Sequence, residues 1–283
     1  MRIAAMGDIH GNHIALEACM KWVYRNNIDG IAFLGDYISD CPYPEKTMRI
    51  IRNIPDAFRT WFVRGNREDY MLDHRYNLTE EWRRGSSRSG SLLYTYQALS
   101  GGDMRFLEAM PIGMEVKLDG YPPFSICHGS MQDNRRLIFP DSPDIDELFD
   151  EFMTGVLVCG HCHKPYTATR GSKTIINAGS VGNPVYGQKG ASIVLLTSDG
   201  GEWSAEHIEI PYDKEALIEE FEQSGLLYFA DVWARAFIAS LRDEDGRNFN
   251  YECATLVKEL RAEQDKEFDD EDIWQEAAKR LGI

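Results

Sequence analysis

Seven side chains that can bind metal ions lie in short loops, each of which follows an apolar run. They are oxygen and imidazole ligands, namely Asp8, His10, Asp36, Asn66, His128, His161 and His163. Asp8 and His10 lie two residues apart, so both side chains can point the same way from an extended loop. Seven such ligands are about what two adjacent divalent ions need when one carboxylate bridges them. Any single member could be an ordinary turn residue, but the ordered set predicts a centre for two metal ions.

Three strand–loop–helix units are expected to position the first four of these residues. The predicted strands are Ile3–Ala5, Gly30–Leu34 and Arg59–Val63, and the helices run from Ile14 to about Asn26 and over Pro44–Asn53. Strands joined in this way run parallel with right-handed crossovers. Loops that follow parallel strands gather at the carboxyl edge of the sheet, where open α/β folds place their chemistry.

The second half of the chain is expected to add a run of short strands. They cover Met114–Leu118, Pro123–Cys127, Val156–Cys159, a strand from Thr174 that turns before Pro184, Ser192–Leu196 and Glu202–Glu209. His128 follows the second of them, and His161 and His163 follow the third. Residues 70–110 are polar and helical in pattern, with a basic break at Arg83–Gly90. Asp103 is expected to N-cap a helix that ends at Met110, before Pro111.

From Asp213 onward the sequence is helical and acidic, with a break at Asp243–Arg247. Its apolar positions are interpreted as packing residues, namely Leu217, Phe221, Leu226, Val232, Phe237 and Leu241. We therefore expect one domain over residues 1–211 and a helical C-terminal extension over 212–283.

Composition narrows the class of protein. The net charge of −16, from 46 acidic and 30 basic residues, makes nucleic acid an unlikely main partner. The sequence contains no apolar run of about 18 residues, which a membrane span would need, and no signal-peptide pattern precedes the first strand. We therefore expect a cytoplasmic protein. The six cysteines are then expected to be free thiols.

Several other features compete for a functional role. Cys159 and Cys162 form a C-x-x-C pair, but no second pair accompanies them and a packing role is favoured over redox or zinc chemistry. His13 and His74 are expected on helices or on the surface. The arginines from Arg83 to Arg88 could touch a phosphate-rich substrate, although a solvated loop is favoured.

The ordered motifs resemble the calcineurin-like metallophosphoesterase superfamily. The resemblance rests on Asp8-x-His10, Gly35-Asp36, Gly65-Asn66, His128-Gly129 and Gly160-His161-x-His163, and it covers residues 1 to about 210. The closing run from Asn177 to Pro184 is similar to the small bacterial and archaeal phosphodiesterase branch. The resemblance implies a four-layer α/β/β/α sandwich with a di-metal centre, and the C-terminal helices would extend it.

The resemblance also implies how two ions would be held. Asp8, His10, Asp36 and His163 would hold one ion, and Asp36, Asn66, His128 and His161 the other. Manganese is favoured, but iron, zinc, nickel and magnesium remain open, because imidazole and oxygen ligands do not select one metal. Asp36, Asn66, Arg67 and His128 are the expected catalytic residues.

The expected reaction is hydrolysis of a small phosphorylated substrate, with a phosphodiester favoured, by attack of a hydroxide that bridges the two ions. Two alternatives stay open. One is a nucleotide or dinucleotide polyphosphate hydrolase, and the other is a metal-binding scaffold with weak catalysis. A homo-oligomer is compatible with the sequence, and we expect no membrane partner.

One residue departs from the family pattern. Many members carry histidine after Gly-Asn, where this chain has Arg67, and that histidine is usually assigned to the leaving group or the transition state. A guanidinium keeps its proton up to about pH 12 and therefore cannot act as a general acid near neutrality. It can hold a phosphoryl oxygen. The alternative is a surface arginine paired with Asp40 or Glu68.

Overall fold

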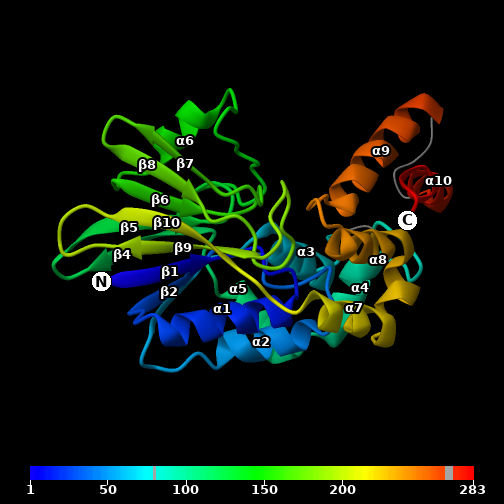
Figure 1. Cartoon of the computed structure of the whole chain (residues 1–283), viewed down its shortest axis with the longest axis horizontal. Helices are drawn as coiled ribbons and strands as arrows, with labels where there is room; N and C mark the ends of the chain where they lie inside the picture. Colours follow the sequence, from blue (N-terminus) through cyan, green and yellow to red (C-terminus); the bar gives the residue numbers. More distant parts are fainter. Residues whose placement is uncertain (79–80, 265–269) are drawn as a thin grey trace.

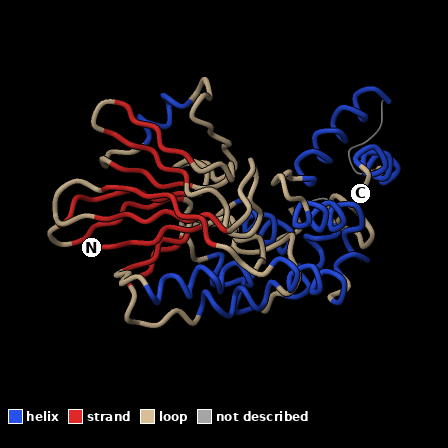
Figure 2. Tube along the Cα trace, viewed as in Figure 1, coloured by secondary structure: helices blue, strands red, loops and turns tan. Residues whose placement is uncertain are grey.

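The computed structural model describes residues 1–78, 81–264 and 270–283. Residues 79–80 of the predicted helical region and 265–269 of the predicted extension lie outside this description. Figure 1 shows the strands gathered in one half of the molecule and most of the helices in the other, and Figure 2 shows loops where the two halves meet.

The first sheet contains the three predicted parallel strands. Its members are β1 (Arg2–Met6), β2 (Gly30–Phe33), β3 (Arg59–Phe62), β9 (Ala191–Thr197) and β10 (Ser204–Ile210), in the order β10-β9-β1-β2-β3. β1, β2 and β3 pair in parallel, and β9 and β10 add antiparallel strands at one side. The carboxyl ends of β1, β2 and β3 therefore meet at one edge, as the crossover pattern predicts.

The second sheet holds the remaining strands. They are β4 (Gly113–Leu118), β5 (Tyr121–Cys127), β6 (Val156–Cys159), β7 (Tyr166–Arg170) and β8 (Lys173–Asn177), in the order β4-β5-β6-β8-β7. β5, β6 and β8 run parallel. β7 was not predicted. It is an edge strand whose residues after Tyr166 are mostly exposed, so no apolar run marks it.

The helices complete the layers. Their bounds are α1 (His13–Arg25), α2 (Pro44–Arg52), α3 (Asn66–Arg75), α4 (Gly90–Ala98), α5 (Gly101–Glu108), α6 (Ile145–Glu151), α7 (Lys214–Gln223), α8 (Leu226–Arg242), α9 (Phe249–Gln264) and α10 (Glu271–Leu281). None of the described helices is long and apolar enough to cross a bilayer.

Alternation along β1 shows how the layers stack. Ile3 and Ala5 lie in the core between the two sheets, together with Phe124 of β5. Ala4 and Met6 point to the opposite face, which α1, α2, α3 and α5 cover. On the outer face of the second sheet, α6 packs against β6 and β8. The predicted α/β fold with two sheets between helical layers is confirmed.

The start of α5 differs from the prediction. Ser100, rather than Asp103, is the N-cap, and its hydroxyl accepts a hydrogen bond of 3.1 Å from the Asp103 amide. The Asp103 carboxylate accepts in return from the Ser100 amide at 3.0 Å. Asp103 is therefore the third helical residue of a capping box, and the helix begins earlier than predicted.

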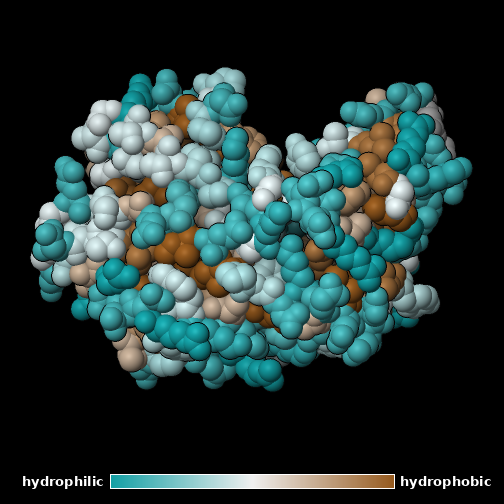
Figure 3. All heavy atoms as spheres, in the orientation of Figure 1, coloured by the Kyte–Doolittle hydropathy of each residue, from teal (hydrophilic) through white to brown (hydrophobic). Residues whose placement is uncertain are grey.

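The C-terminal helices pack in two clusters. α7 and α8 lie against Cys41 and, more loosely, against Ile14 and Tyr94. α9 and α10 pack on α8 around Val232 and Trp274, and Figure 3 shows apolar atoms on the face of this part of the molecule. All the predicted packing positions of this region are buried, namely Leu217, Phe221, Leu226, Val232, Phe237 and Leu241.

Candidate metal centre

The seven predicted ligands lie together at the carboxyl ends of the strands. Two groups each offer ligand atoms within 4.8 Å of one another, the first made of Asp8, His10 and His163 and the second of Asp36, His128 and His161. Asn66 joins the second group, since its Oδ1 lies 3.1 Å from Nε2 of His128. The two groups follow the division that the family resemblance implies.

Asp36 lies between the two groups. Its Oδ1 is 3.4 Å from Nε2 of His128, and its Oδ2 is 3.8 Å from Nε2 of His10. The carboxylate therefore presents one oxygen to each group, which is the placement that a shared ligand of two ions requires.

Backbone carbonyls fix the orientation of three imidazoles. Nδ1 of His128 lies 2.8 Å from the Leu34 oxygen, Nδ1 of His163 lies 2.7 Å from the Asn183 oxygen, and Nε2 of His161 lies 3.0 Å from the Arg135 oxygen. A carbonyl only accepts hydrogen bonds, so each of these nitrogens carries the proton. The other nitrogen of each ring is then the one that a metal ion can bind, as in protein metal sites.

His10 is oriented by a carboxylate instead. Its Nδ1 lies 2.9 Å from Oδ2 of Asp40, whose side chain is fully buried. This contact places the lone pair on Nε2, which is 3.0 Å from Nε2 of His163. Two ring nitrogens at this distance repel each other unless a proton or a metal ion lies between or beside them. The first group thus fits a metal ion.

The electrostatics of the centre favour a cation as well. Burial lowers the pKa of His128, but Asp36 and Asp8 raise it to about 10. Burial raises the pKa of Asp36, yet His128 and His10 lower it by more, so it lies below its usual range. The buried carboxylates of Asp8 and Asp36 thus stabilise a positive charge beside His128. A metal ion can supply that charge instead of the proton on His128. Burial and His128 lower the pKa of His161 to about 4, which leaves that ring neutral at pH 7.

The ligand loops adopt strained backbone conformations. Five of the ligands have positive φ, namely Asp8 (52°), His10 (51°), Asp36 (52°), His161 (67°) and His163 (58°). Such conformations cost about 1–3 kcal/mol each and persist where the surrounding structure imposes them. Gly65 and Gly160 permit the close approach, because a Cβ atom would lie 2.2 Å from Oδ1 of Asp36 and 2.4 Å from Oδ2 of Asp8.

Three supporting residues were not predicted. Glu68 is fully buried and accepts hydrogen bonds of 2.8–2.9 Å from the amides of Gly65, Asp36 and Tyr37, so it holds two ligand loops together. Asp40 contacts His10 and also accepts a hydrogen bond of 2.9 Å from Nε1 of Trp233 on α8. The sequence suggested Asp40 and Glu68 only as partners for Arg67. Nothing in the sequence connects Trp233 with the loop that carries Asp40.

Arg67 pairs with Asp40, as the alternative interpretation foresaw, but it is not a surface residue. Its Nη2 lies 3.2 Å from Oδ2 of Asp40, and its side chain is 21% exposed. Burial lowers the pKa of Arg67, but Asp40 and Asp36 raise it above the usual value, so the guanidinium stays charged. Its Nε is buried and finds no hydrogen-bond partner among the described residues.

The remaining candidates are not among the ligand groups. His13 is on α1 and His74 on α3, as expected, but His13 is buried, with Nε2 at 2.8 Å from Glu220. Cys159 and Cys162 are buried free thiols in the core outside the second sheet, in agreement with a packing role.

The fold and the ligand set define an α/β sandwich protein with a candidate metal centre at the carboxyl ends of its strands. The chain belongs to the calcineurin-like phosphoesterase superfamily, because the sequence model of that superfamily domain matches residues 1–201.

Individual proteins are similar to this chain over most of its length. An uncharacterized protein of Methanocaldococcus jannaschii is 26% identical over 241 residues, which cover 79% of this chain and 93% of that protein. The crystal structure of a metallophosphoesterase from Sphaerobacter thermophilus is similar with a TM-score of 0.68 and 20% identity, over 84% of this chain and 98% of that one. A hypothetical protein from Pyrococcus horikoshii gives a TM-score of 0.69 at 20% identity, over 86% and 98% of the two chains. These structures show the fold.

Proposed function

We propose that the protein is a phosphoesterase that uses two divalent metal ions, and that phosphodiesters are its preferred substrates. The observation that carries the proposal is the position of Asp36, with one carboxylate oxygen toward each ligand group. The four imidazoles, each with one nitrogen held by an acceptor and the other turned inward, support it. Asp8, His10, Asp36 and His163 would hold one ion, and Asp36, Asn66, His128 and His161 the other.

When two divalent ions are bound, they supply charge that attracts phosphoryl oxygens and lowers the pKa of a water molecule. The chain's own residues position these parts. Asp40 orients His10, and Glu68 holds the backbone of the Asp36 and Asn66 loops. Arg67 keeps a charged donor beside the centre, where it can bind a phosphoryl oxygen of the substrate.

The first test is turnover of bis(p-nitrophenyl) phosphate by the pure full-length protein. We expect release of p-nitrophenol that is lost on chelation and restored by added Mn²⁺, and less by Mg²⁺. The same measurement addresses the scaffold alternative. A protein that binds two ions per chain and yet shows no turnover with any of Mn²⁺, Fe²⁺, Zn²⁺, Ni²⁺ or Mg²⁺ is a scaffold and not a phosphoesterase.

A second prediction concerns Arg67 and the leaving group. Arg67→Ala is expected to lower turnover of bis(p-nitrophenyl) phosphate about 10- to 100-fold, the value of one charge-assisted hydrogen bond of about 1.5–3 kcal/mol. Because an arginine donates no proton near neutrality, the wild type is expected to hydrolyse activated diesters well and sugar monophosphates weakly. Arg67→His should raise alkyl monoester turnover relative to diester turnover, since histidine can protonate a poor leaving group.

Arg25→Ala is the matched control, because Arg25 is an exposed arginine at the end of α1. Its kinetics should equal those of the wild type. Arg67 has no part in the chemistry if Arg67→Ala leaves rates unchanged and the wild type prefers alkyl monoesters.

A further inference from the structure

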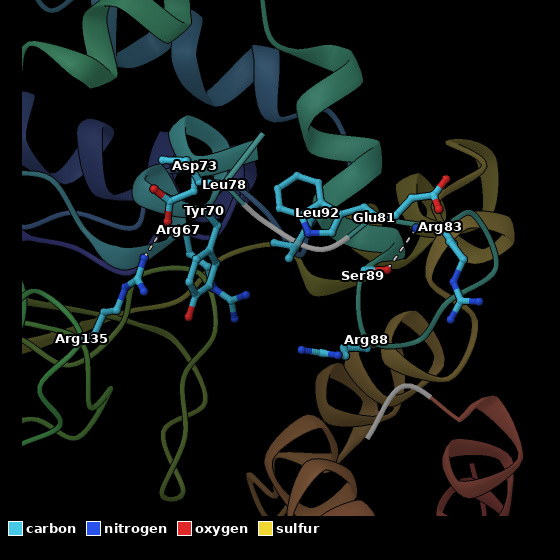
Figure 4. A pocket seen from close by; sticks show the side chains of 11 residues that line it. Arg67, Tyr70, Asp73, Leu78, Glu81, Arg83, Arg88, Ser89, Leu92 and Arg135 are labelled. Atoms are coloured by element: carbon cyan, nitrogen blue, oxygen red, sulfur yellow. Dashed lines mark hydrogen bonds and ion pairs between the residues drawn. The ribbon is translucent and has the colours of Figure 1, made fainter. Parts of the chain in front are cut away.

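A cavity of about 440 Å³ lies beside the metal centre. Its lining includes four arginines and two aromatic residues, namely Arg67, Arg83, Arg88, Arg135, Tyr70 and Trp82. Figure 4 shows Arg67, Tyr70 and Arg135 on one side of this cavity and Arg83, Arg88 and Ser89 on the other. The volume falls within the range of about 300–1,000 Å³ that is usual for small-molecule sites.

Two of the lining residues connect the cavity to the ligands. The amide of Arg67 donates a hydrogen bond of 2.8 Å to Oδ1 of Asp36. The carbonyl oxygen of Arg135 accepts from Nε2 of His161 at 3.0 Å. A substrate whose reacting phosphoryl group lies at the metal centre can therefore extend into this cavity.

The charge of the lining is opposite to that of the chain. Four arginines face two acidic residues, Asp73 and Glu81, in a protein with a net charge of −16. Nη2 of Arg135 lies 3.0 Å from Asp73, and the guanidinium groups of Arg67 and Arg135 flank the Tyr70 ring at 5.9 Å and 5.2 Å. Guanidinium groups held in this way suit the planar, two-point recognition of phosphate oxygens.

The lining also offers a flat apolar surface. The Trp82 ring stacks on His74 with centroids 3.9 Å apart and an interplanar angle of 3°, and it meets Tyr96 edge-on. These contacts fix the indole in one orientation. A fixed aromatic ring next to cationic groups is suited to a ligand that joins a planar heterocycle to a phosphate.

The C-terminal extension positions the far wall. The amide of Gly85 donates to the Phe229 oxygen at 2.8 Å, and the Ser87 side chain donates to Glu271 on α10. α8 is interrupted at Asp231, where φ is 34°, and the next amide, that of Val232, donates to the Ser87 hydroxyl at 3.0 Å. The backbone of this segment is therefore anchored at Gly85 and Ser87, while the side chains of Arg83 and Arg88 are exposed, as expected for a solvated loop.

We propose that this cavity binds the nucleoside phosphate part of the substrate, with its base against Trp82 and its phosphate among the arginines. The proposal rests on the proposed phosphoesterase function, and it names the substrate class of that site as nucleotide-containing phosphodiesters or phosphoanhydrides. It also assigns a role to the extension, which holds the wall of the cavity that carries Arg83 and Arg88.

The test is isothermal calorimetry on the full-length, Mn²⁺-loaded protein with three probes: AMP, ribose 5-phosphate and adenosine. AMP should bind about 5- to 150-fold more tightly than ribose 5-phosphate, because stacking of a base contributes about 1–3 kcal/mol. It should also bind more tightly than adenosine, which lacks the phosphate that the arginines would hold. Arg83→Gln and Arg88→Gln should each weaken AMP binding about tenfold, in line with the loss of a hydrogen bond to a charged group. Arg25→Gln should leave the affinity unchanged. Trp82→Phe, which keeps a ring, should retain more affinity than Trp82→Leu.

Equal affinities for AMP and ribose 5-phosphate would overturn the proposal, because the metal ions alone would then explain binding of the phosphate. So would AMP binding that is unaffected in both arginine variants. The measurement needs no turnover, so its result is separate from that of the phosphodiesterase assay. A protein that binds AMP as expected and hydrolyses no phosphodiester refutes the function but not the site.

Discussion

Asp36→Asn is expected to abolish turnover and to reduce the metal content below two ions per chain. The substitution keeps the size of the side chain but removes a negative charge that faces both ligand groups, at 3.4 Å from His128 and 3.8 Å from His10. Loss of a residue that only hydrogen-bonds a metal ligand lowers activity by up to about 100-fold. Because Asp36 would bind the ions directly, we expect kcat to fall by more than that. Elemental analysis of the dialysed protein and kinetics with bis(p-nitrophenyl) phosphate measure the two effects.

Asn66→Ala provides the contrast. Asn66 contacts His128 of the second group, so its loss should weaken mainly one ion. The metal titration should then show one tight and one weakened site, with part of the activity recovered at high Mn²⁺. The shared role of Asp36 is wrong if Asp36→Asn retains two ions per chain and a normal rate.

Truncation after Pro211 is the second change with a large expected effect. It removes the helices that cover Ile14, Cys41 and Tyr94. Exposure of Cys41 and of the partly buried Ile14 and Tyr94 costs at most about 1.5–3 kcal/mol each, and each kcal/mol lowers Tm by about 2–4 °C in a chain of this size. We expect Tm to fall by about 10 °C or more, together with aggregation or a changed mass in solution. Differential scanning calorimetry and light scattering measure these effects.

A single substitution separates packing from the polar contact with the centre. Trp233→Phe keeps a ring on α8 but removes the 2.9 Å hydrogen bond to Asp40, which orients His10 and pairs with Arg67. The variant should stay folded, and its kcat should fall about 10- to 100-fold, as for other residues that hydrogen-bond metal ligands.

The truncation has its own contrary outcome. If the chain that ends at Pro211 remains soluble with unchanged mass and kinetics, the extension is dispensable.

The order of the elements and the candidate ligands could be predicted because they depend on local patterns. Apolar runs followed by Asp8, Asp36, Asn66 and His128 mark the ends of buried strands, and parallel pairing brings such ends to one edge. Where the local signal is weak, prediction fails. β7 carries no apolar run. The start of α5 depends on reciprocal hydrogen bonds between Ser100 and Asp103, and both residue types are common N-caps, so the sequence alone does not tell which of them caps the helix.

The surroundings of the ligands were decided by the tertiary structure. The amino-acid type of Arg67 excludes an acid role, yet its burial and its pairing with Asp40 depend on how the loop after β2 folds against α3. Trp233 reaches the same carboxylate from 193 residues away in the chain. Arg83 and Arg88 are exposed, as their basic segment predicts, but the sequence gives no sign that α8 and α10 anchor the backbone between them. Contacts between residues so far apart in the chain produce no recognisable pattern in the sequence. They depend on how whole helices and strands pack, and not on the spacing of neighbouring residues.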